Sequence, residues 1–258
     1  ARPLGPAERT DSLFCRSGLV DAPFEQWVET LAALDRAADD AYVVPSIIVG
    51  DIDEAVRMAR AFEQAGLRWL ELNVGAPHVE EAAPGAIRAG VDLVRPVREA
   101  VTIPLTVKVG GLDPVSAAIA AQDAGADAVV VATRAQGFVT DLETRRPVLG
   151  TFAAIGGAWA LPITCRHLAK TRRARPDACL VGTNGARNGR DVAQMLLAGA
   201  SAVQLTSIVL TDGPVALRRA AEELSAYLDE QGVSARDLIG EAADAVQTYE
   251  EVAVERRH

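Results

Sequence analysis

The sequence has little of what several protein classes require. Aromatic residues make up only 4% of the 258 residues, and the formal net charge is −9 with a sequence pI of about 4.9. A nucleic-acid-binding protein needs a basic surface and often aromatic stacking platforms, so this composition argues against that class. No apolar run reaches the roughly 18 residues of a membrane span, and Ala1 to Pro6 contain no apolar signal core.

Cysteine is also scarce. The three cysteines, Cys15, Cys165 and Cys179, are far apart in the chain and form no CxxC pair. This spacing supports neither a zinc site nor a disulfide framework. We therefore expect no metal, a reducing environment and a cytoplasmic protein without a membrane or nucleic-acid partner.

Lysine is rarer still, because only Lys108 and Lys170 are lysine among 26 basic residues. The remaining composition is ordinary for a globular protein, with 49% apolar and 24% charged residues. The length is close to the roughly 250 residues of one α/β barrel. Because no linker or low-complexity tract interrupts the chain, we expect one barrel domain over residues 1–258.

A recurring pattern predicts alternating helices and strands. Helix-like stretches end at Ala65-Gly66, Ala124-Gly125 and Ala198-Gly199, and a β-branched run follows each of them. Glycine suits the left-handed residue that closes a helix, and runs that are apolar on both faces are typical of buried parallel strands. Asp51 and Pro114 are suitable residues at helix starts. The stretch from residue 237 to 258 predicts a last helix with a charged end.

The alternation indicates an α/β protein with a parallel sheet, of the TIM (β/α)8 barrel type. Six strands are predicted: Val43–Val49, Trp69–Val74, Leu105–Val109, Ala128–Ala132, Ala178–Val181 and Ala202–Thr206. Two strands of a complete barrel are missing from this set, and an open barrel would leave unpaired edges. Either a segment precedes residue 1 or another element closes the barrel.

Polar residues stand where the predicted strands end, which is where barrel active sites are built. These residues are Asn73, Lys108, Thr133, Asn184 and Ser207. A lysine inside an apolar strand must find a partner or a ligand, since an unpaired buried charge is costly. Lys108 is therefore a candidate cofactor-facing cation, although a lysine can also reach solvent from a strand end.

Three loops could bind a ligand, and each also has a purely structural interpretation. The loop from Asn73 to His78 offers hydrogen-bonding groups and a histidine that could titrate near neutrality, or a solvated histidine. Gly182 to Gly185, together with Thr206-Ser207, could form a phosphate site or an ordinary strand-to-helix turn. Gly156-Gly157 could equally be a turn at the start of a helix. No P-loop, GxGxxG, HExxH or GxSxG signature is present.

The order of motifs resembles the dihydroorotate dehydrogenases of the soluble class. The resemblance rests on Glu71-Leu-Asn-Val-Gly-Ala-Pro77, Pro104-Leu-Thr-Val-Lys108, Asp141-Leu-Glu-Thr-Arg-Arg-Pro147, Gly156-Gly157, Val181-Gly-Thr-Asn-Gly185 and Ala198-Gly-Ala-Ser-Ala-Val-Gln204. It implies a TIM barrel that binds FMN at the carboxyl ends of its strands.

The resemblance also implies roles for particular residues. Lys108 matches the flavin lysine of the family, and Asn73 matches an asparagine that faces cofactor and substrate. The phosphate loops of the family match Gly182 to Ala186, with Asn184 and Gly185, and Thr206-Ser207. Thr133, which is one of the polar residues at the strand ends, and Gly157 are also candidate cofactor-binding residues.

Several positions depart from the family pattern. The catalytic cysteine or serine of the family falls on Ala76, which cannot move a proton, and general-base catalysis typically contributes about 10²–10⁴-fold. The orotate-binding asparagines fall on Cys15, His78 and Ala132. Asn184 and Thr206 are larger than the glycines that would let the backbone approach a phosphate.

Two hypotheses follow. The first is a divergent FMN-dependent oxidoreductase acting on a small polar substrate other than dihydroorotate, with His78 and Lys108 as catalytic residues. The second is a barrel without flavin chemistry that serves as a scaffold or binds another phosphorylated compound. The tRNA-dihydrouridine synthases share part of the Asn73 loop, but the acidic pI opposes tRNA binding. A homodimer is the default assembly.

Overall fold

The computed structural model describes residues 2–3, 12–16, 22–75, 91–131 and 134–247. Six strands form the parallel sheet that the sequence predicts, and their order is β12-β11-β6-β5-β4-β3. Their bounds are β3 Ser46–Ile47, β4 Leu70–Asn73, β5 Leu105–Lys108, β6 Ala128–Val131, β11 Leu180–Thr183 and β12 Ala202–Gln204. Most are shorter than predicted, and β3 shrinks from seven expected residues to two.

The parallel sheet curls round on itself. Strands β12 and β3 occupy opposite ends of the strand order, yet Gln204 of β12 donates a hydrogen bond to Glu71 of β4, the neighbour of β3. The Nε2–Oε2 distance of this bond is 2.7 Å. The inner face of the sheet is therefore partly enclosed, as in a barrel, although no pairing between β3 and β12 joins the described strands into a ring.

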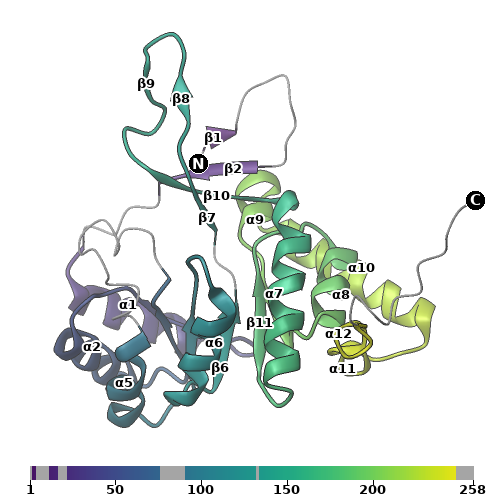
Figure 1. Ribbon diagram of the computed structural model, residues 1–258. Coiled ribbons are helices and arrows are strands. Elements are labelled where there is room, and N and C mark those ends of the chain that lie inside the picture. Colours follow the sequence, from purple (N-terminus) through teal and green to yellow (C-terminus); the bar gives the residue numbers. More distant parts are fainter. Residues whose placement is uncertain (1, 4–11, 17–21, 76–90, 132–133, 248–258) are drawn as a thin grey trace, which may run out of the picture.

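Helices cover the outer face of the curled sheet (Figure 1). They include α1 Phe24–Ala37, α2 Ile52–Gln64, α5 Val94–Ala100, α6 Pro114–Asp123, α7 Leu161–Ala174, α8 Gly189–Leu197, α9 Ser207–Asp212 and α10 Val215–Gln231. The core between the two layers contains leucines and valines from alternate strand positions that are fully buried: Leu70, Leu72, Leu105, Val107 and Val129. This burial is the main stabilising contribution to the fold.

The predicted helix boundaries are confirmed. Gly66, Gly125 and Gly199 have φ angles of 90°, 105° and 111°, the left-handed conformation that closes a helix. The side chain of Asp51 accepts a hydrogen bond from the backbone N–H of Glu54, which caps α2. Helix α6 begins at Pro114.

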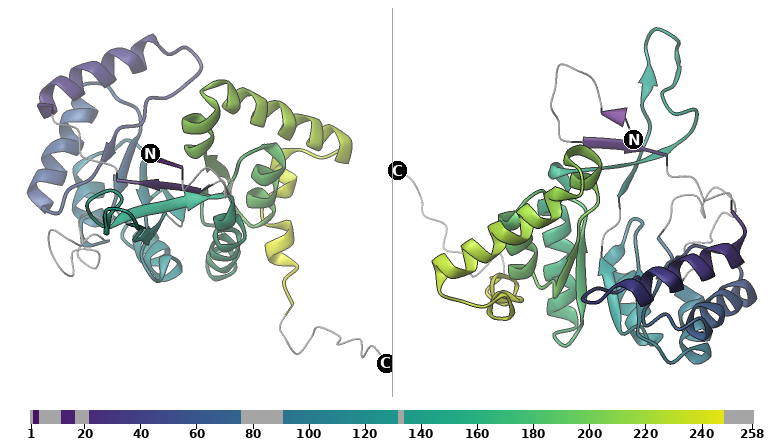
Figure 2. Two further views of the ribbon diagram at one scale, coloured as in Figure 1. Left: turned by 90° about the horizontal axis from the view of Figure 1, so that it is seen from above. Right: turned by 180° about the vertical axis from the view of Figure 1, so that it is seen from behind.

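A second, antiparallel sheet was not predicted from the sequence. It has the order β1-β2-β10-β7, with bounds β1 Arg2–Pro3, β2 Ser12–Cys15, β7 Ala135–Gly137 and β10 Ala153–Gly157. It lies across the carboxyl-terminal side of the parallel sheet (Figure 2). A separate hairpin of β8 Thr140–Asp141 and β9 Arg146–Pro147 projects away from the molecule (Figure 1). These strands are short, and the pairing of β2 with β10 joins segments about 140 residues apart, so local patterning does not reveal the antiparallel sheet.

The prediction for the C-terminal stretch is wrong. In place of one helix from residue 237, two single turns form: α11 Ala235–Leu238 and α12 Glu241–Asp244. Gly240 between them adopts a left-handed φ of 83° and donates its N–H to the carbonyl of Leu196 at 2.9 Å. This bond ties the chain back to α8 and interrupts the helix. Residues 248–258 lie outside the described part of the chain.

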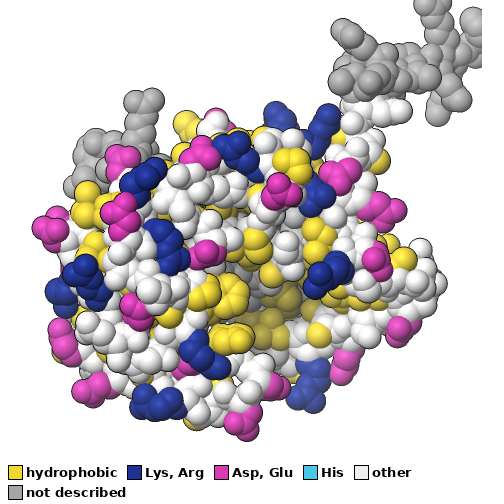
Figure 3. Space-filling view, turned by 90° about the horizontal axis from the view of Figure 1, so that it is seen from below, with side chains coloured by type: hydrophobic (Ala, Val, Ile, Leu, Met, Phe, Trp, Pro, Cys, Tyr) yellow, Lys and Arg dark blue, Asp and Glu magenta, His cyan; other side chains and the backbone are white. Residues whose placement is uncertain are grey.

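Viewed from the side opposite the projecting hairpin, the molecule is hollowed at its centre, and hydrophobic side chains gather in the hollow (Figure 3). This is the side at which the parallel strands begin, since β7 follows the carboxyl end of β6 toward the opposite side. In the part of the chain that the structure describes, no helix is long and apolar enough to cross a lipid bilayer.

Candidate functional site

Lys108 and Asn73 lie side by side at the carboxyl ends of β5 and β4, where they are register partners. On its other side Lys108 is paired with Val130 of β6, which is fully buried. The Lys108 side chain is half-buried, and its Nζ donates a hydrogen bond to Oε1 of Gln204 at 2.8 Å. The lysine therefore points into the interior of the curled sheet, where Gln204 is, and not to the outer helical layer.

Two further polar residues continue from Gln204, and the sequence analysis did not identify either as functional. Gln204 Nε2 donates to Glu71 Oε2 at 2.7 Å, and Ser46 Oγ donates to Glu71 Oε1 at 2.7 Å. Glu71 is only 6% exposed. A carboxylate inside an otherwise apolar strand is the signal that could have revealed this residue, because a buried charge requires partners.

The loop after β4 is pressed against the loop after β5. Asn73 Oδ1 accepts a hydrogen bond from the N–H of Gly75 at 3.2 Å. A Cβ atom at Gly75 would lie 2.5 Å from the backbone nitrogen of Gly110, so only glycine fits there. This contact fixes the backbone beside Asn73 and Lys108 at the edge of the site.

A second cluster forms where β10 and β11 end. Asn184 follows β11 with a left-handed φ of 68°, and its Oδ1 accepts the N–H of Gly157 at 3.2 Å. A Cβ atom at Gly156 would lie 2.9 Å from the same Oδ1. The carboxamide of Asn184 thus occupies the space beside Gly156-Gly157 and uses one backbone donor that a phosphate could otherwise contact.

Two of the candidate glycines are explained by packing. A Cβ atom at Gly182 would lie 2.7 Å from the sulfur of Met195 in α8, on the outer side of the sheet. A Cβ atom at Gly185, where φ is 121°, would lie 2.4 Å from the backbone nitrogen of Leu161 in α7. Packing therefore requires glycine at position 185 whether or not a ligand binds beside it, whereas at position 182 a larger residue would make the Met195 side chain shift.

Among the described residues, no hydrogen bond joins the remaining candidates to Lys108 or Asn73. Thr206 is exposed at the residue before α9, and Ser207 is the first residue of that six-residue helix. Gly157 ends β10 and precedes a short 3₁₀ turn, Ala158–Ala160, and then α7, so the predicted turn at a helix start is confirmed in part. His78 and Thr133 lie outside the described residues, as do Ala76 and Ala132.

The ionisable groups on α7 do not supply a reactive centre. Burial raises the pKa of the Cys165 thiol to about 11, and the charge of Asp191 adds to the effect. The thiol is therefore protonated near neutral pH and a poor nucleophile. Burial also lowers the pKa of His167, as does the nearby Arg166. Across the described residues, no group of three or more His, Cys, Asp and Glu side chains could hold a metal ion.

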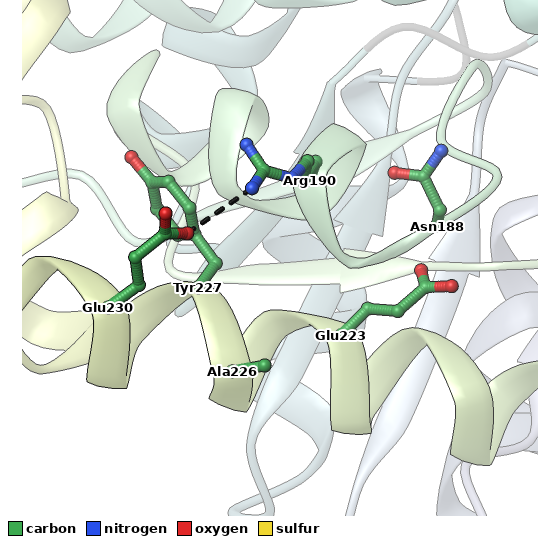
Figure 4. Close-up of a pocket in the computed structure, with 6 residues that line it drawn as sticks. All are labelled: Asn188, Arg190, Glu223, Ala226, Tyr227 and Glu230. Carbon is green, nitrogen blue, oxygen red and sulfur yellow. Dashed lines mark hydrogen bonds and ion pairs between the residues drawn. The ribbon is translucent and has the colours of Figure 1, made fainter.

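A cavity of about 420 Å³ lies elsewhere, between α8 and α10 in the outer helical layer (Figure 4). Its charged groups already have partners: Arg190 forms an ion pair with Glu230 at 3.3 Å and lies over the ring of Tyr227. Glu223 accepts the N–H of Gly189 at 2.9 Å. No candidate residue from the sequence lines this cavity, so we place the functional site at the carboxyl edge of the sheet.

Comparisons with known proteins show which proteins the chain is similar to. A protein-family model described as dihydroorotate dehydrogenase matches residues 8–228. Dihydroorotate dehydrogenase A (fumarate) of Lactobacillus helveticus is 30% identical over 240 residues, covering 90% of this chain and 78% of that protein. The catalytic subunit of dihydroorotate dehydrogenase B (NAD(+)) of Desulforudis audaxviator is 33% identical over 214 residues, covering 79% of this chain and 68% of that protein.

A solved structure supports the fold. The dihydroorotate dehydrogenase of Eimeria tenella in complex with ferulenol superposes with a TM-score of 0.61 at 17% identity, covering 84% of this chain and 66% of that chain. The parallel sheet with outer helices and this neighbour together confirm the predicted TIM-barrel-type architecture. With a family match over most of its length, the chain belongs to the dihydroorotate dehydrogenase family.

Proposed function

We propose that this protein is an FMN-dependent oxidoreductase of the dihydroorotate dehydrogenase type that acts on a small polar substrate. The observation that carries the proposal is the position of Lys108, half-buried at the carboxyl end of β5 with its ammonium directed into the sheet interior. The ammonium has three donors, and within the described residues only one of them makes a hydrogen bond. The relatives named dihydroorotate dehydrogenase A and B support the reaction class.

The groups around Lys108 fit the oxygen-bearing edge of a flavin ring. That edge presents carbonyl oxygens and ring nitrogens, which call for donors such as an ammonium and a side-chain amide. Lys108 and Asn73 offer these groups next to each other on adjacent strands. When bound, FMN would accept a hydride from the substrate or return it. The positive charge of Lys108 would stabilise negative charge on the reduced ring.

The proton-transfer residue differs from the family pattern. Alanine stands at position 76 where the family places its base, so we propose that His78 carries the proton and that dihydroorotate oxidation does not follow the standard mechanism. The phosphate of FMN would lie toward Gly157, Asn184, Thr206 and Ser207. There the Asn184 carboxamide already bonds the Gly157 amide, which leaves one donor fewer for the phosphate.

The visible absorption spectrum of the purified protein, before and after addition of FMN, tests the proposal. We expect a flavin spectrum and a thermal stabilisation by FMN, which would reach about 2.7 kcal/mol at 100 times its Kd. Lys108→Met should weaken FMN binding by at least about tenfold, since a hydrogen bond to a charged group is worth about 1.5–3 kcal/mol. The matched control is Lys170→Met on the exposed face of α7, which should leave binding unchanged.

Other outcomes would overturn parts of the proposal. A colourless protein that takes up no FMN but is stabilised by a different phosphorylated compound would favour a barrel without flavin chemistry. His78→Ala should abolish substrate-dependent flavin reduction while flavin remains bound. Full activity in that variant would assign the proton transfer to another residue.

A further inference from the structure

Four side chains from four strands form one continuous hydrogen-bonded network, which runs from the exposed Ser46 into the interior of the curled sheet. The order is Ser46 of β3, Glu71 of β4, Gln204 of β12 and Lys108 of β5. The three donor–acceptor distances are 2.7, 2.7 and 2.8 Å. All three distances lie within the ordinary range of hydrogen bonds, and the acceptor Glu71 is only 6% exposed.

The donors and acceptors in this hydrogen-bonded network allow only one orientation of the Gln204 amide. The Glu71 carboxylate can only accept hydrogen bonds, so the amide must turn its NH₂ group toward Glu71. Its carbonyl oxygen then faces Lys108, which can only donate. Each member satisfies the next, and the lysine ammonium is held in place without direct contact to a carboxylate.

The arrangement also separates the two opposite charges. Glu71 is the buried carboxylate of this hydrogen-bonded network, and the amide of Gln204 stands between it and Lys108. In the described part of the chain no ion pair involves Lys108. The pair is therefore balanced in net charge, while two of the ammonium donors make no hydrogen bond to the described residues and point away from Gln204, where a ligand could accept them.

We infer that Gln204 and Glu71 are positioning residues that orient the Lys108 ammonium toward the ligand through the amide of Gln204. They keep the compensating carboxylate one residue away, so that the lysine charge acts on the ligand and is not quenched by an ion pair. The part of this inference that concerns flavin rests on the proposed function. The part that concerns the orientation of Lys108 is independent of it.

The scarcity of lysine makes a direct test possible. Protein with ¹⁵N-labelled lysine gives two side-chain signals, one from Lys108 and one from the exposed Lys170, which serves as an internal reference. In the unaltered protein we expect the Lys108 ammonium protons to exchange with water more slowly than those of Lys170. Gln204→Ala removes the acceptor and should make exchange at Lys108 about tenfold faster.

Swapping the carboxylate of residue 71 and the amide of residue 204 separates a positioning role from a general structural effect. In Glu71→Gln, residue 204 can turn its NH₂ toward Lys108, so the slow exchange should be lost. In the double variant Glu71→Gln with Gln204→Glu, the new amide donates to the new carboxylate, which accepts from Lys108. The slow exchange should therefore return. Ser46→Ala, which leaves the Glu71 carboxylate in place, is the control and should retain slow exchange.

Flavin affinity then distinguishes the two parts of the inference. The double variant places a carboxylate directly on Lys108, so FMN should bind at least about tenfold more weakly although slow exchange is restored. Unchanged slow exchange in Glu71→Gln would overturn the positioning role. If slow exchange returns in the double variant while its FMN affinity is unaltered, the positioning role is retained and Lys108 is removed from the flavin site. Cooperative unfolding and an unshifted Lys170 signal verify that each variant is folded.

Discussion

Two clusters of polar groups on the carboxyl side of the parallel sheet differ in how their hydrogen bonds are satisfied. We call them the β4–β5–β12 end and the β10–β11 end, the second of which includes β10 of the antiparallel sheet. At the β4–β5–β12 end, hydrogen bonds join the side chains of Glu71, Gln204 and Lys108, and among the described residues only one of the three ammonium donors of Lys108 is used. At the β10–β11 end, Asn184 accepts a hydrogen bond from Gly157. Atoms of the neighbouring helices occupy the space beside Gly182 and Gly185. The comparison teaches that the first end, where we propose that a ligand binds, keeps donors that are unused among the described residues, whereas the second end is stabilised chiefly by contacts within the protein.

The largest expected effect tests the packing role of the β10–β11 end. Gly185→Ala would place a Cβ 2.4 Å from Leu161 N at a φ of 121°, so we expect the free energy of unfolding to fall by about 3 kcal/mol. Urea denaturation measures this. The matched control is Gly150→Ala, which has a φ of 75° but nothing within 4 Å, and should cost about 1 kcal/mol. Equal losses would contradict the packing explanation.

A second substitution tests the hydrogen bonds that hold the same end. Thr164 of α7 is 1% exposed, and its Oγ1 donates to the carbonyls of Thr183 and Asn184 at 3.2 and 2.9 Å. Thr164→Val should lower the free energy of unfolding by about 1–2 kcal/mol, because buried carbonyls lose a donor. Thr30→Val makes the same chemical change at an exposed position on α1 and should cost less than about 0.5 kcal/mol. A similar loss in both variants would argue that the position of Thr164 is unimportant.

Removing the Asn184 side chain should make the two ends more alike. Asn184→Gly frees the N–H of Gly157 and vacates the space beside Gly156, so the affinity for FMN relative to riboflavin should rise by about tenfold. Fluorescence titration with the two flavins measures the ratio. The control, Asn188→Gly, removes the cap of α8 and should lower stability by a few tenths of a kcal/mol without altering the ratio. A ratio that stays constant in Asn184→Gly would show that Asn184 does not restrict the phosphate.

The smallest effect concerns pH and the helix that follows β10. Burial lowers the pKa of His167 below its usual value, while Asp113 partly opposes this. The unfolded chain therefore binds a proton more readily than the native protein, so stability declines as the pH falls from about 6.5 through the native pKa. His167→Gln should flatten the dependence of the unfolding free energy on pH below about pH 6.5. An identical pH profile in that variant would assign the dependence to other groups.

The sequence revealed the parallel part of the fold and the lysine. Strands such as Leu105–Lys108 are continuous apolar runs, and the Ala-Gly pairs that precede them end their helices as expected. Lys108 was identifiable because a charge inside such a run is costly, and the family resemblance supplied its role. Glu71 carries the same signal, but its partner Gln204 is 133 residues away, and no local pattern links them.

Residue types and local patterns therefore determined the order of elements, the family and which buried polar residues need hydrogen-bond partners. Tertiary structure alone decided which groups satisfy them. The curl of the sheet brings β12 against β4, so that an amide separates Glu71 from Lys108. Helix packing filled the space around Gly182 and Gly185, and the left-handed turn at Asn184 directed its carboxamide onto Gly157. Hydrogen-bond partners depend on distances between remote strands, and those distances are set only when the apolar faces pack together.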